Sequence, residues 1–410
     1  MSRQDDSKRV LEFEEARQIV ITTVRSLART GQIKDVPLTE AHGRTLAEPV
    51  LADRDYPALR RSLRDGFAVR SSEVPGVLRV RGELRAGQEE SNALEPGEAL
   101  EIMTGAPVPA QADAVVMVEH VIRASASDGA PEVRIDRKAE VGQFINEKGA
   151  EASMGKVLIE AGVMLDASHI ATLAMTGHPS IRVFAKPSIA ILATGDEIVE
   201  LSVRPSAHQI RNSNSYMLAA CVTAAGGVPK ISPIARDQRD VLRASLLEGL
   251  SHDMLLVSGG VSAGRYDLVK PALEELGAVF HFEKVRIQPG GPTAFGSIRG
   301  KPVFGLPGNP GSSLVTFQLF AQPALELLSG VVEPILPLLR AKFEAPFRHR
   351  PGLTRFLPAR LSADGQHLRH LPWQGSSDIP ALAQANAFLV AEHDRETWDA
   401  GDTIRVMRKI

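Results

Sequence analysis

Cysteine is almost absent from this 410-residue sequence, which contains only Cys221. A single thiol excludes intramolecular disulfides and any zinc site built from several cysteines, and it fits a reducing compartment. We interpret Cys221 as a thiol buried in the core. Several catalytic signatures are missing as well, namely HExxH, the Walker A loop, GxGxxG after a strand and the GxSxG elbow. The chemistries that these motifs support are therefore not expected.

The sequence also lacks an excess of charge and any long apolar run. Its 47 basic and 49 acidic side chains leave a formal charge of −2, so no global field favours nucleic acid or an anionic membrane. The first residues, MSRQDDSKR, lack the apolar core of a signal peptide, and no apolar run reaches the length of a membrane span. We expect a cytoplasmic protein that binds neither nucleic acid nor membrane.

Length and composition predict several folded domains. A chain of 410 residues exceeds what one hydrophobic core supports, and 43% hydrophobic residues are enough to fill more than one. Changes of pattern along the chain give four domains. They are a helical N-terminal domain at 8–52 with 150–185, a β domain at 53–149 inserted into it, an α/β domain at 186–332 and a C-terminal β-barrel-like domain at 333–410.

Local periodicity supports this division. Helical spacing of apolar residues over 13–27 predicts an amphipathic helix, and a shorter helix is expected around 38–46. Short β-prone runs between turn residues over 66–146 predict the small β domain. From Pro187 onward, buried-strand runs alternate with helical stretches, which predicts a parallel sheet with helices on both faces. The strand runs are 189–192, 230–234, 254–257 and 303–306, and the helical stretches are 214–225, 239–249, 268–276 and 311–328.

Three glycine-containing loops follow strands of the predicted sheet. Ligands bind at the carboxyl ends of parallel strands, where glycines permit close approach and successive N–H groups attract anions. Asn309 as a helix cap and Pro310 in the first helical turn also have a purely structural explanation. Three such loops in one sheet nevertheless favour a binding site. The loops are Thr194-Gly195-Asp196-Glu197, Ser258-Gly259-Gly260-Val261-Ser262 and Leu306-Pro307-Gly308-Asn309-Pro310.

Four acidic residues in predicted turns are candidate metal ligands. One or two carboxylates together with ligand phosphates suffice to hold Mg²⁺. An isolated aspartate in a turn is more often a cap or turn former, and this alternative stays open for Asp65 and Asp237. The four residues are Asp65, Glu197, Asp237 and Asp267.

Read together, these motifs resemble the molybdopterin molybdenumtransferase family, which includes the bacterial MoeA proteins and the E domain of gephyrin. The resemblance covers nearly the whole chain, in order and in spacing. The most specific segments are DGFAV at 65–69, IMTGAP at 102–107, ADAVV at 112–116, ATGDE at 193–197, QIRNSN at 209–214, SGGVSAG at 258–264 and LPGNP at 306–310.

The resemblance implies a homodimer of four-domain subunits with a MogA-like α/β domain, and a reaction that inserts molybdate into adenylylated molybdopterin and releases AMP with the help of Mg²⁺. A MogA-type adenylyltransferase and molybdoenzyme maturation proteins are the implied partners. By the same resemblance, the catalytic residues are Asp65, Thr104, Glu197, Asp237 and Asp267, the metal ligands are Glu197, Asp267 and Glu151, and the ligand-binding residues are Thr194, Gly195, Asp196, Asn214, Ser258 to Ser262 and Pro307 to Pro310.

The chain departs from the family pattern at its anion-binding positions. The usual PGKP motif reads Pro289-Gly290-Gly291-Pro292, without the lysine, and the usual GED motif reads Gly149-Ala150-Glu151. Arg64 and Arg265 are candidates to replace the missing charge, although a guanidinium is no isostere of lysine. Two alternatives to a working transferase follow: a paralogue that binds molybdopterin as a chaperone or scaffold, and a generic nucleotide-binding α/β protein.

Overall fold

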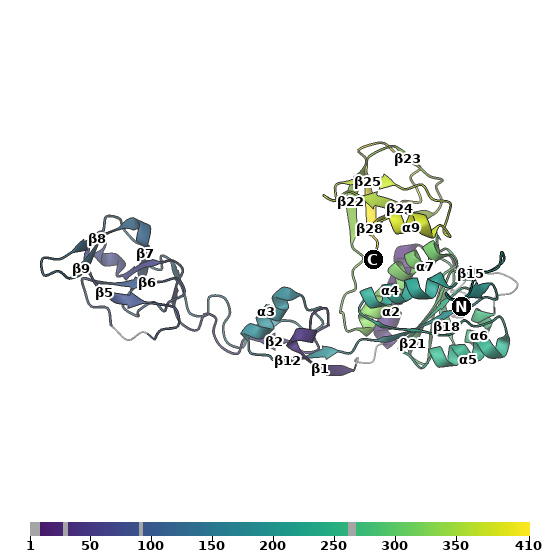
Figure 1. The fold of residues 1–410 in the computed structure, drawn as a ribbon, viewed down its shortest axis with the longest axis horizontal. Coiled ribbons are helices and arrows are strands. Elements are labelled where there is room, and N and C mark those ends of the chain that lie inside the picture. Colours follow the sequence, from purple (N-terminus) through teal and green to yellow (C-terminus); the bar gives the residue numbers. More distant parts are fainter. Residues whose placement is uncertain (1–8, 28–31, 90–92, 261–267) are drawn as a thin grey trace. The chain divides into compact units, whose positions relative to one another are not determined.

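The computed structural model describes residues 9–27, 32–89, 93–260 and 268–410. The chain divides into two compact units (Figure 1). The first contains Met1–Glu48, Gly162–Ala167 and Ser180–Ile410, and the second contains Pro49–Ala161 and Ser168–Pro179. Each unit is described by itself. The four domain boundaries expected from the sequence stay predictions.

The second unit is built around a six-stranded sheet in the order β7-β4-β6-β5-β9-β8. Apolar side chains fill both faces, with Phe67 and Val69 on one side and Ala68 on the other. The predicted β domain is therefore confirmed. The strands are β4 (Gly66–Val69), β5 (Gly76–Leu84), β6 (Glu98–Ile102), β7 (Ala114–Met117), β8 (Val121–Ser125) and β9 (Pro131–Ile135), accompanied by the pairs β2 (Val50–Leu51) with β11 (Val157–Ile159) and β3 (Arg61–Ser62) with β10 (Ile145–Asn146), and by helix α3 (Ala167–Met175).

The first unit contains the predicted α/β sheet, in the order β16-β13-β17-β21-β20-β18. The first four strands are parallel, as expected, and the last two are antiparallel. The change of direction arises at Arg299-Gly300, a two-residue loop with positive φ at both positions, which only an antiparallel hairpin accommodates. The strands are β13 (Ser188–Ala193), β16 (Val228–Ile231), β17 (Met254–Ser258), β18 (Val279–Phe282), β20 (Ala294–Ile298) and β21 (Lys301–Leu306).

Helices cover both faces of this sheet. Ile189 and Ile191 point into the core beneath α2, α4 and α8, while Ala190 and Leu192 point into the core beneath α5 and α6. This explains why the strand reads as a continuous apolar run. Cys221 is buried in the first core, as predicted, and burial raises the pKa of its thiol to about 11. The helices are α2 (Phe13–Leu27), α4 (Ser213–Ala224), α5 (Arg239–Gly249), α6 (Val269–Glu275), α7 (Pro310–Thr316), the π-helix η4 (Phe317–Ala321) and α8 (Gln322–Leu328).

The N-terminal segment joins this unit through α2. The predicted helix over 13–27 is confirmed, and its buried Arg17 donates hydrogen bonds to the carbonyls of Leu319 (3.1 Å) and Pro334 (2.9 Å). The prediction of a second helix around 38–46 is wrong. Only the three-residue 3-10 turn Leu38–Glu40 forms there, directly after β1 (Ile33–Pro37). Strand β1 pairs with β12 (Ser180–Phe184) instead of leading into a helix.

The C-terminal segment forms a small barrel, as predicted. Its sheet has the order β19-β24-β25-β22-β28-β26, and an additional pairing of β24 with β26 closes it. Strand β19 directly precedes the PGGP segment and pairs with β24, with Gln288 beside Arg355. The elements are β19 (Ile287–Gln288), β22 (Leu338–Phe343), β24 (Thr354–Leu361), β25 (His367–His370), β26 (Ala387–Ala391) and β28 (Thr403–Arg408), with the pair β23 (Phe347–Arg348) and β27 (Thr397–Trp398) and helix α9 (Ile379–Gln384). Among the described residues, no helix is long and apolar enough to span a membrane.

His370 makes the stability of this barrel depend on pH. Its ring lies 5.2 Å from that of Phe347, and its buried Nε2 has no hydrogen-bond partner among the described residues. Burial lowers the pKa of His370. As the pH falls below about 6.5, the unfolded chain therefore binds a proton that the folded barrel resists.

We expect the free energy of unfolding to be steady at about pH 8 and to fall toward about pH 5.5. His370→Leu should reduce this fall, measured by urea unfolding followed through tryptophan emission. His367→Leu, at an exposed position of the same strand, is the control. An identical pH dependence in His370→Leu and in the unaltered protein would contradict the prediction.

Candidate functional site

The ends of three parallel strands form one edge of the first unit. The backbone N–H of Thr194 donates to the carbonyl of Ser258 (3.1 Å), and the N–H of Gly259 donates to the carbonyl of Leu306 (3.0 Å). The loops after β13, β17 and β21 therefore lie side by side. The structure thus brings together the three loops that the sequence singles out.

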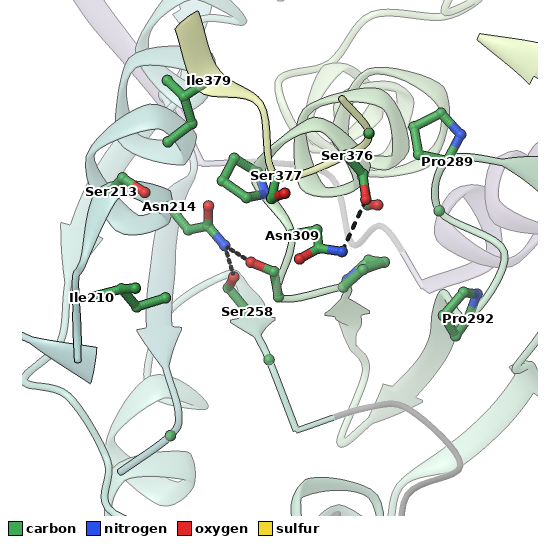
Figure 2. A pocket seen from close by; sticks show the side chains of 18 of the residues that line it. Ile210, Ser213, Asn214, Ser258, Pro289, Pro292, Asn309, Ser376, Ser377 and Ile379 are labelled. Atoms are coloured by element: carbon green, nitrogen blue, oxygen red, sulfur yellow. Dashed lines mark hydrogen bonds between the residues drawn. The ribbon is translucent and has the colours of Figure 1, made fainter. Parts of the chain in front are cut away.

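Asn214 ties this edge to helix α4. Its Nδ2 donates to Ser258 Oγ (2.8 Å) and to the carbonyl of Gly308 (2.7 Å), as Figure 2 shows. Asn212 caps the same helix, because its side chain accepts the N–H of Ser215 (3.2 Å). The Oδ1 of Asn214 and the Oγ1 of Thr194 are buried without a partner among the described residues. Such atoms are rare in folded proteins, and here they border a cavity.

Two glycines permit the loops to approach so closely. A Cβ on Gly259, which has φ +92°, would lie 2.8 Å from the carbonyl oxygen of Thr194. A Cβ on Gly195, which has φ +142°, would lie 2.6 Å from a carboxylate oxygen of Glu197. A side chain at Gly259 would therefore force its loop away from Thr194, whereas one at Gly195 would displace the Glu197 carboxylate within the same loop.

The cavity above this edge has a volume of about 1290 Å³. It exceeds the usual range for small-molecule sites and has room for a ligand larger than one nucleotide. Its lining combines the strand-end loops, the PGGP segment and one side of the barrel. Of the predicted site residues, the lining includes Thr194, Gly195, Glu197, Asn214, Asp237, Ser258, Gly259, Gly260, Pro307, Gly308, Asn309 and Pro310.

Acidic groups collect at one end of the cavity. Glu197 and Asp237 line it, and Asp196 lies behind them with its Oδ1 accepting the N–H of Asp237 (3.3 Å). Burial and the nearby charges of Asp196 and Glu197 raise the pKa of Asp237. These carboxylates repel one another, and a cation would relieve that repulsion.

The predicted metal ligands are not gathered in one place by the described part of the chain. No group of three or more His, Cys, Asp or Glu residues is arranged there to hold a metal. Glu197 lines the cavity, and Glu151 belongs to the other unit, where it accepts a hydrogen bond from Asn146 Nδ2 (2.9 Å). Asp267 lies outside the described residues, as do the predicted ligand-binding residues Val261 and Ser262.

Two further predicted catalytic residues lie together in the second unit. Asp65 Oδ1 accepts hydrogen bonds from the backbone N–H and from the hydroxyl of Thr104, both at 2.7 Å. These bonds lower the pKa of Asp65. The sequence motifs thus identify a real side-chain pair, formed across 39 residues of sequence.

The barrel supplies lining residues that sequence reasoning missed. Arg355 lines the cavity, and its Nε is buried without a partner among the described residues. The pairing of β19 with β24 places it beside Gln288, next to the PGGP turn. Trp373 and Ser376 line the same cavity. No local spacing in the sequence connects these residues to the loops, because the connection is a strand pairing across 67 residues.

The role of Asn309 differs from that of a simple helix cap. Its side chain makes no capping hydrogen bond to α7; instead, its Nδ2 donates to Ser376 Oγ (2.9 Å; Figure 2). The N–H of Gly311 also donates to the carbonyl of Ser376 (2.8 Å). The start of α7 is therefore fastened to the barrel loop.

Comparison with known proteins identifies the family. The chain matches the models of the MoeA N-terminal region (domain I and II) at residues 11–177, of a probable molybdopterin binding domain at 190–327 and of the MoeA C-terminal region (domain IV) at 340–408. Together these models match most of the chain. The chain belongs to the MoeA family.

Individual members of the MoeA family are similar over their whole length. A molybdopterin molybdenumtransferase of Bacillus subtilis is 33% identical, covering 92% of this chain and 90% of the relative, and one of Nostoc sp. is 35% identical, covering 95% and 92%. Two structures of a molybdopterin biosynthesis MoeA protein from Pyrococcus horikoshii give TM-scores of 0.76 and 0.80 at 31% and 25% identity, and cover 98% of this chain. Fold and family, as the motifs predict, are confirmed.

Removal of the Asn214 side-chain amide tests how the loops after β17 and β21 are held together. Asn214→Ala deprives Ser258 and Gly308 of a shared donor, so we expect the free energy of unfolding to fall by about 1–2 kcal/mol. Urea unfolding measures the change. Thr223→Ala, which removes a hydroxyl bonded to Ala219 on the same helix, is the control and should cost less. Equal losses in the two variants would contradict a special role for Asn214.

Proposed function

We propose that this chain is a working molybdopterin molybdenumtransferase: it inserts molybdate into adenylylated molybdopterin and releases AMP. The observation that carries the proposal is the convergence, in one cavity, of the strand-end loops, two carboxylates and Arg355, whose buried Nε has no partner among the described residues. A dianionic substrate and a phosphoanhydride both require fixed donors and positive charge. This cavity provides them from separate walls.

The strand-end loops bind and orient the phosphate-bearing part of the substrate in this proposal. Asn214 fixes the SGG and PGNP loops relative to each other, while the glycines leave backbone N–H groups accessible. The unpartnered hydroxyl of Thr194 can donate a hydrogen bond to a phosphate oxygen, whereas the unpartnered Oδ1 of Asn214 can only accept one from an N–H or O–H of the ligand. A preorganised donor stabilises developing negative charge without reorganising.

The acidic end of the cavity fits Mg²⁺. Glu197 and Asp237 would hold it, since their oxygens are the ligands that Mg²⁺ prefers. Burial, with the charges of Asp196 and Glu197, raises the pKa of Asp237, and a bound cation would stabilise its ionised form. When bound, Mg²⁺ neutralises charge that develops on the phosphates during anhydride cleavage. We propose Asp267 and Glu151 as further ligands, and Asp65 with Thr104 as active-site residues, on the family resemblance.

Arg355 supplies the cation that the PGGP segment lacks. Its position beside Gln288 brings a guanidinium to the turn where the family usually carries lysine. A planar guanidinium forms two parallel hydrogen bonds to an oxyanion, so the charge is conserved although its donor geometry differs. This observation favours a transferase over the alternative of a binding-only chaperone or scaffold.

We also propose a homodimer that receives adenylylated molybdopterin from a MogA-type adenylyltransferase and passes its product to molybdoenzyme maturation proteins. The family resemblance supports this arrangement. Size-exclusion chromatography with light scattering measures the oligomeric state, and a monomer at micromolar concentration would contradict the dimer.

The direct test of the activity uses purified protein with adenylylated molybdopterin, molybdate and Mg²⁺. We expect release of AMP together with formation of molybdenum cofactor, measured by chromatography and by reconstitution of a molybdoenzyme. Absence of both products at saturating substrate would overturn the proposal. Binding of the substrate without turnover would support the chaperone alternative.

Loss of Arg355 should weaken molybdate binding. Arg355→Ala removes the guanidinium, and we expect the molybdate concentration for half-maximal rate to rise by about tenfold to a hundredfold. Arg355→Lys should retain part of the affinity. The control is Arg360→Ala, at an exposed position of the same strand, where the guanidinium bonds the carbonyl of Gln384. If Arg355→Ala leaves the molybdate concentration for half-maximal rate unchanged, this assignment is contradicted, and Arg64 or Arg265 is favoured as the cation.

A lysine returned to the PGGP turn provides the complementary test. A Cβ on Gly291 would approach the carbonyls of Ile287 and Val285 at 3.3 and 3.4 Å, so the turn needs only a small adjustment. In the Arg355→Ala protein, we expect Gly291→Lys to lower the molybdate concentration for half-maximal rate back toward that of the unaltered protein. A double variant no better than Arg355→Ala would show that the two positions do not share a function.

A further inference from the structure

Trp373 differs in chemical type from the other side chains that line the cavity. Among the described residues that line the cavity, it is the single aromatic side chain. Leu353 and Leu357 line the cavity from the same barrel, so the indole has apolar neighbours there. The cavity therefore offers one aromatic surface, and it lies on the barrel side.

The indole is held in place by its neighbours. Its side chain is partly buried against the core of the barrel. A Cβ added to Gly311 would come within 3.3 Å of Trp373 Cζ3, so the ring lies against the first turn of α7, directly after the PGNP loop. The chain that follows the indole is fastened by Ser376 to Asn309 and Gly311, at 2.9 and 2.8 Å.

A fixed indole beside phosphate-binding loops suits a particular kind of ligand. Stacking on an aromatic side chain stabilises a planar ring, whatever polar groups the ring carries on its edge. An aliphatic or purely ionic ligand would gain little from stacking on the indole itself. The substrate class named under the proposed function contains two planar heterocycles, the pterin and the adenine.

We propose that Trp373 is the stacking platform for a planar nitrogen heterocycle of the substrate, and so a binding residue that the strand-end motifs do not reveal. This inference rests on the proposed function. The ring lies on the indole while the phosphates reach the PGNP loop, because Trp373 and that loop meet at Gly311. Arg355 lines the same cavity and remains available to the anion.

The first experiment measures affinity by calorimetry, with AMP and with 6-hydroxymethylpterin as probes. For the ring that occupies the indole, Trp373→Leu should weaken binding by about tenfold to a hundredfold, whereas Trp373→Phe should retain most of the affinity. The probe that loses affinity identifies the ring. Unchanged affinity for both probes in Trp373→Leu would overturn the proposal.

A second experiment leaves Trp373 in place, in case its replacement disturbs the barrel. The chain has two tryptophans, and Trp398 is buried, so Trp398→Phe isolates the emission of Trp373. We expect a bound probe to protect this emission from acrylamide. Binding by calorimetry without protection would overturn the stacking proposal alone. Failure of the unaltered protein to bind either probe would overturn this proposal and the proposed function together.

Discussion

The side-chain amide of Asn214 is the interaction on which the cavity depends. Through one nitrogen it joins the first turn of α4 to the end of β17 and to the loop after β21. Parallel strands deliver these loops to the same edge, and both faces of the sheet are filled by apolar side chains. The ligand-binding groups can therefore gather only beyond the strand ends, and Asn214 sets their spacing.

Sequence patterns predicted this half of the site because its determinants are local. A strand buried on both faces reads as an apolar run, and the glycines at its end mark the close approaches at Gly195 and Gly259. The antiparallel strand β20 was not predicted, since its direction depends on the two-residue turn at Arg299-Gly300 that joins it to β21. The short helix expected over 38–46 failed because tertiary pairing prevailed over local helical preference: Leu46 forms a bridge with Val183, and the N–H of Ala47 donates to the carbonyl of Arg182.

The barrel side of the site could not be predicted from motifs. Arg355 reaches the cavity through the pairing of β19 with β24, which depends on tertiary structure rather than on residue spacing. Motif comparison therefore identifies a lost lysine at Gly291 but not the cation that stands nearby. The two candidates named from the sequence, Arg64 and Arg265, are departures from the family pattern in other motifs, whereas Arg355 lies beside the PGGP segment through a strand pairing.

The pairing of β19 with β24 also has a mechanical consequence. The residues directly before the PGGP turn and the strand of Arg355 belong to one ladder, and Ser376 fastens the same barrel to the start of α7. The barrel cannot swing away from the anion-binding turn unless these bonds break. The charge of Arg355 is thus a fixed part of the cavity wall, and under the proposed function molybdate would enter a site that needs no domain closure to become cationic.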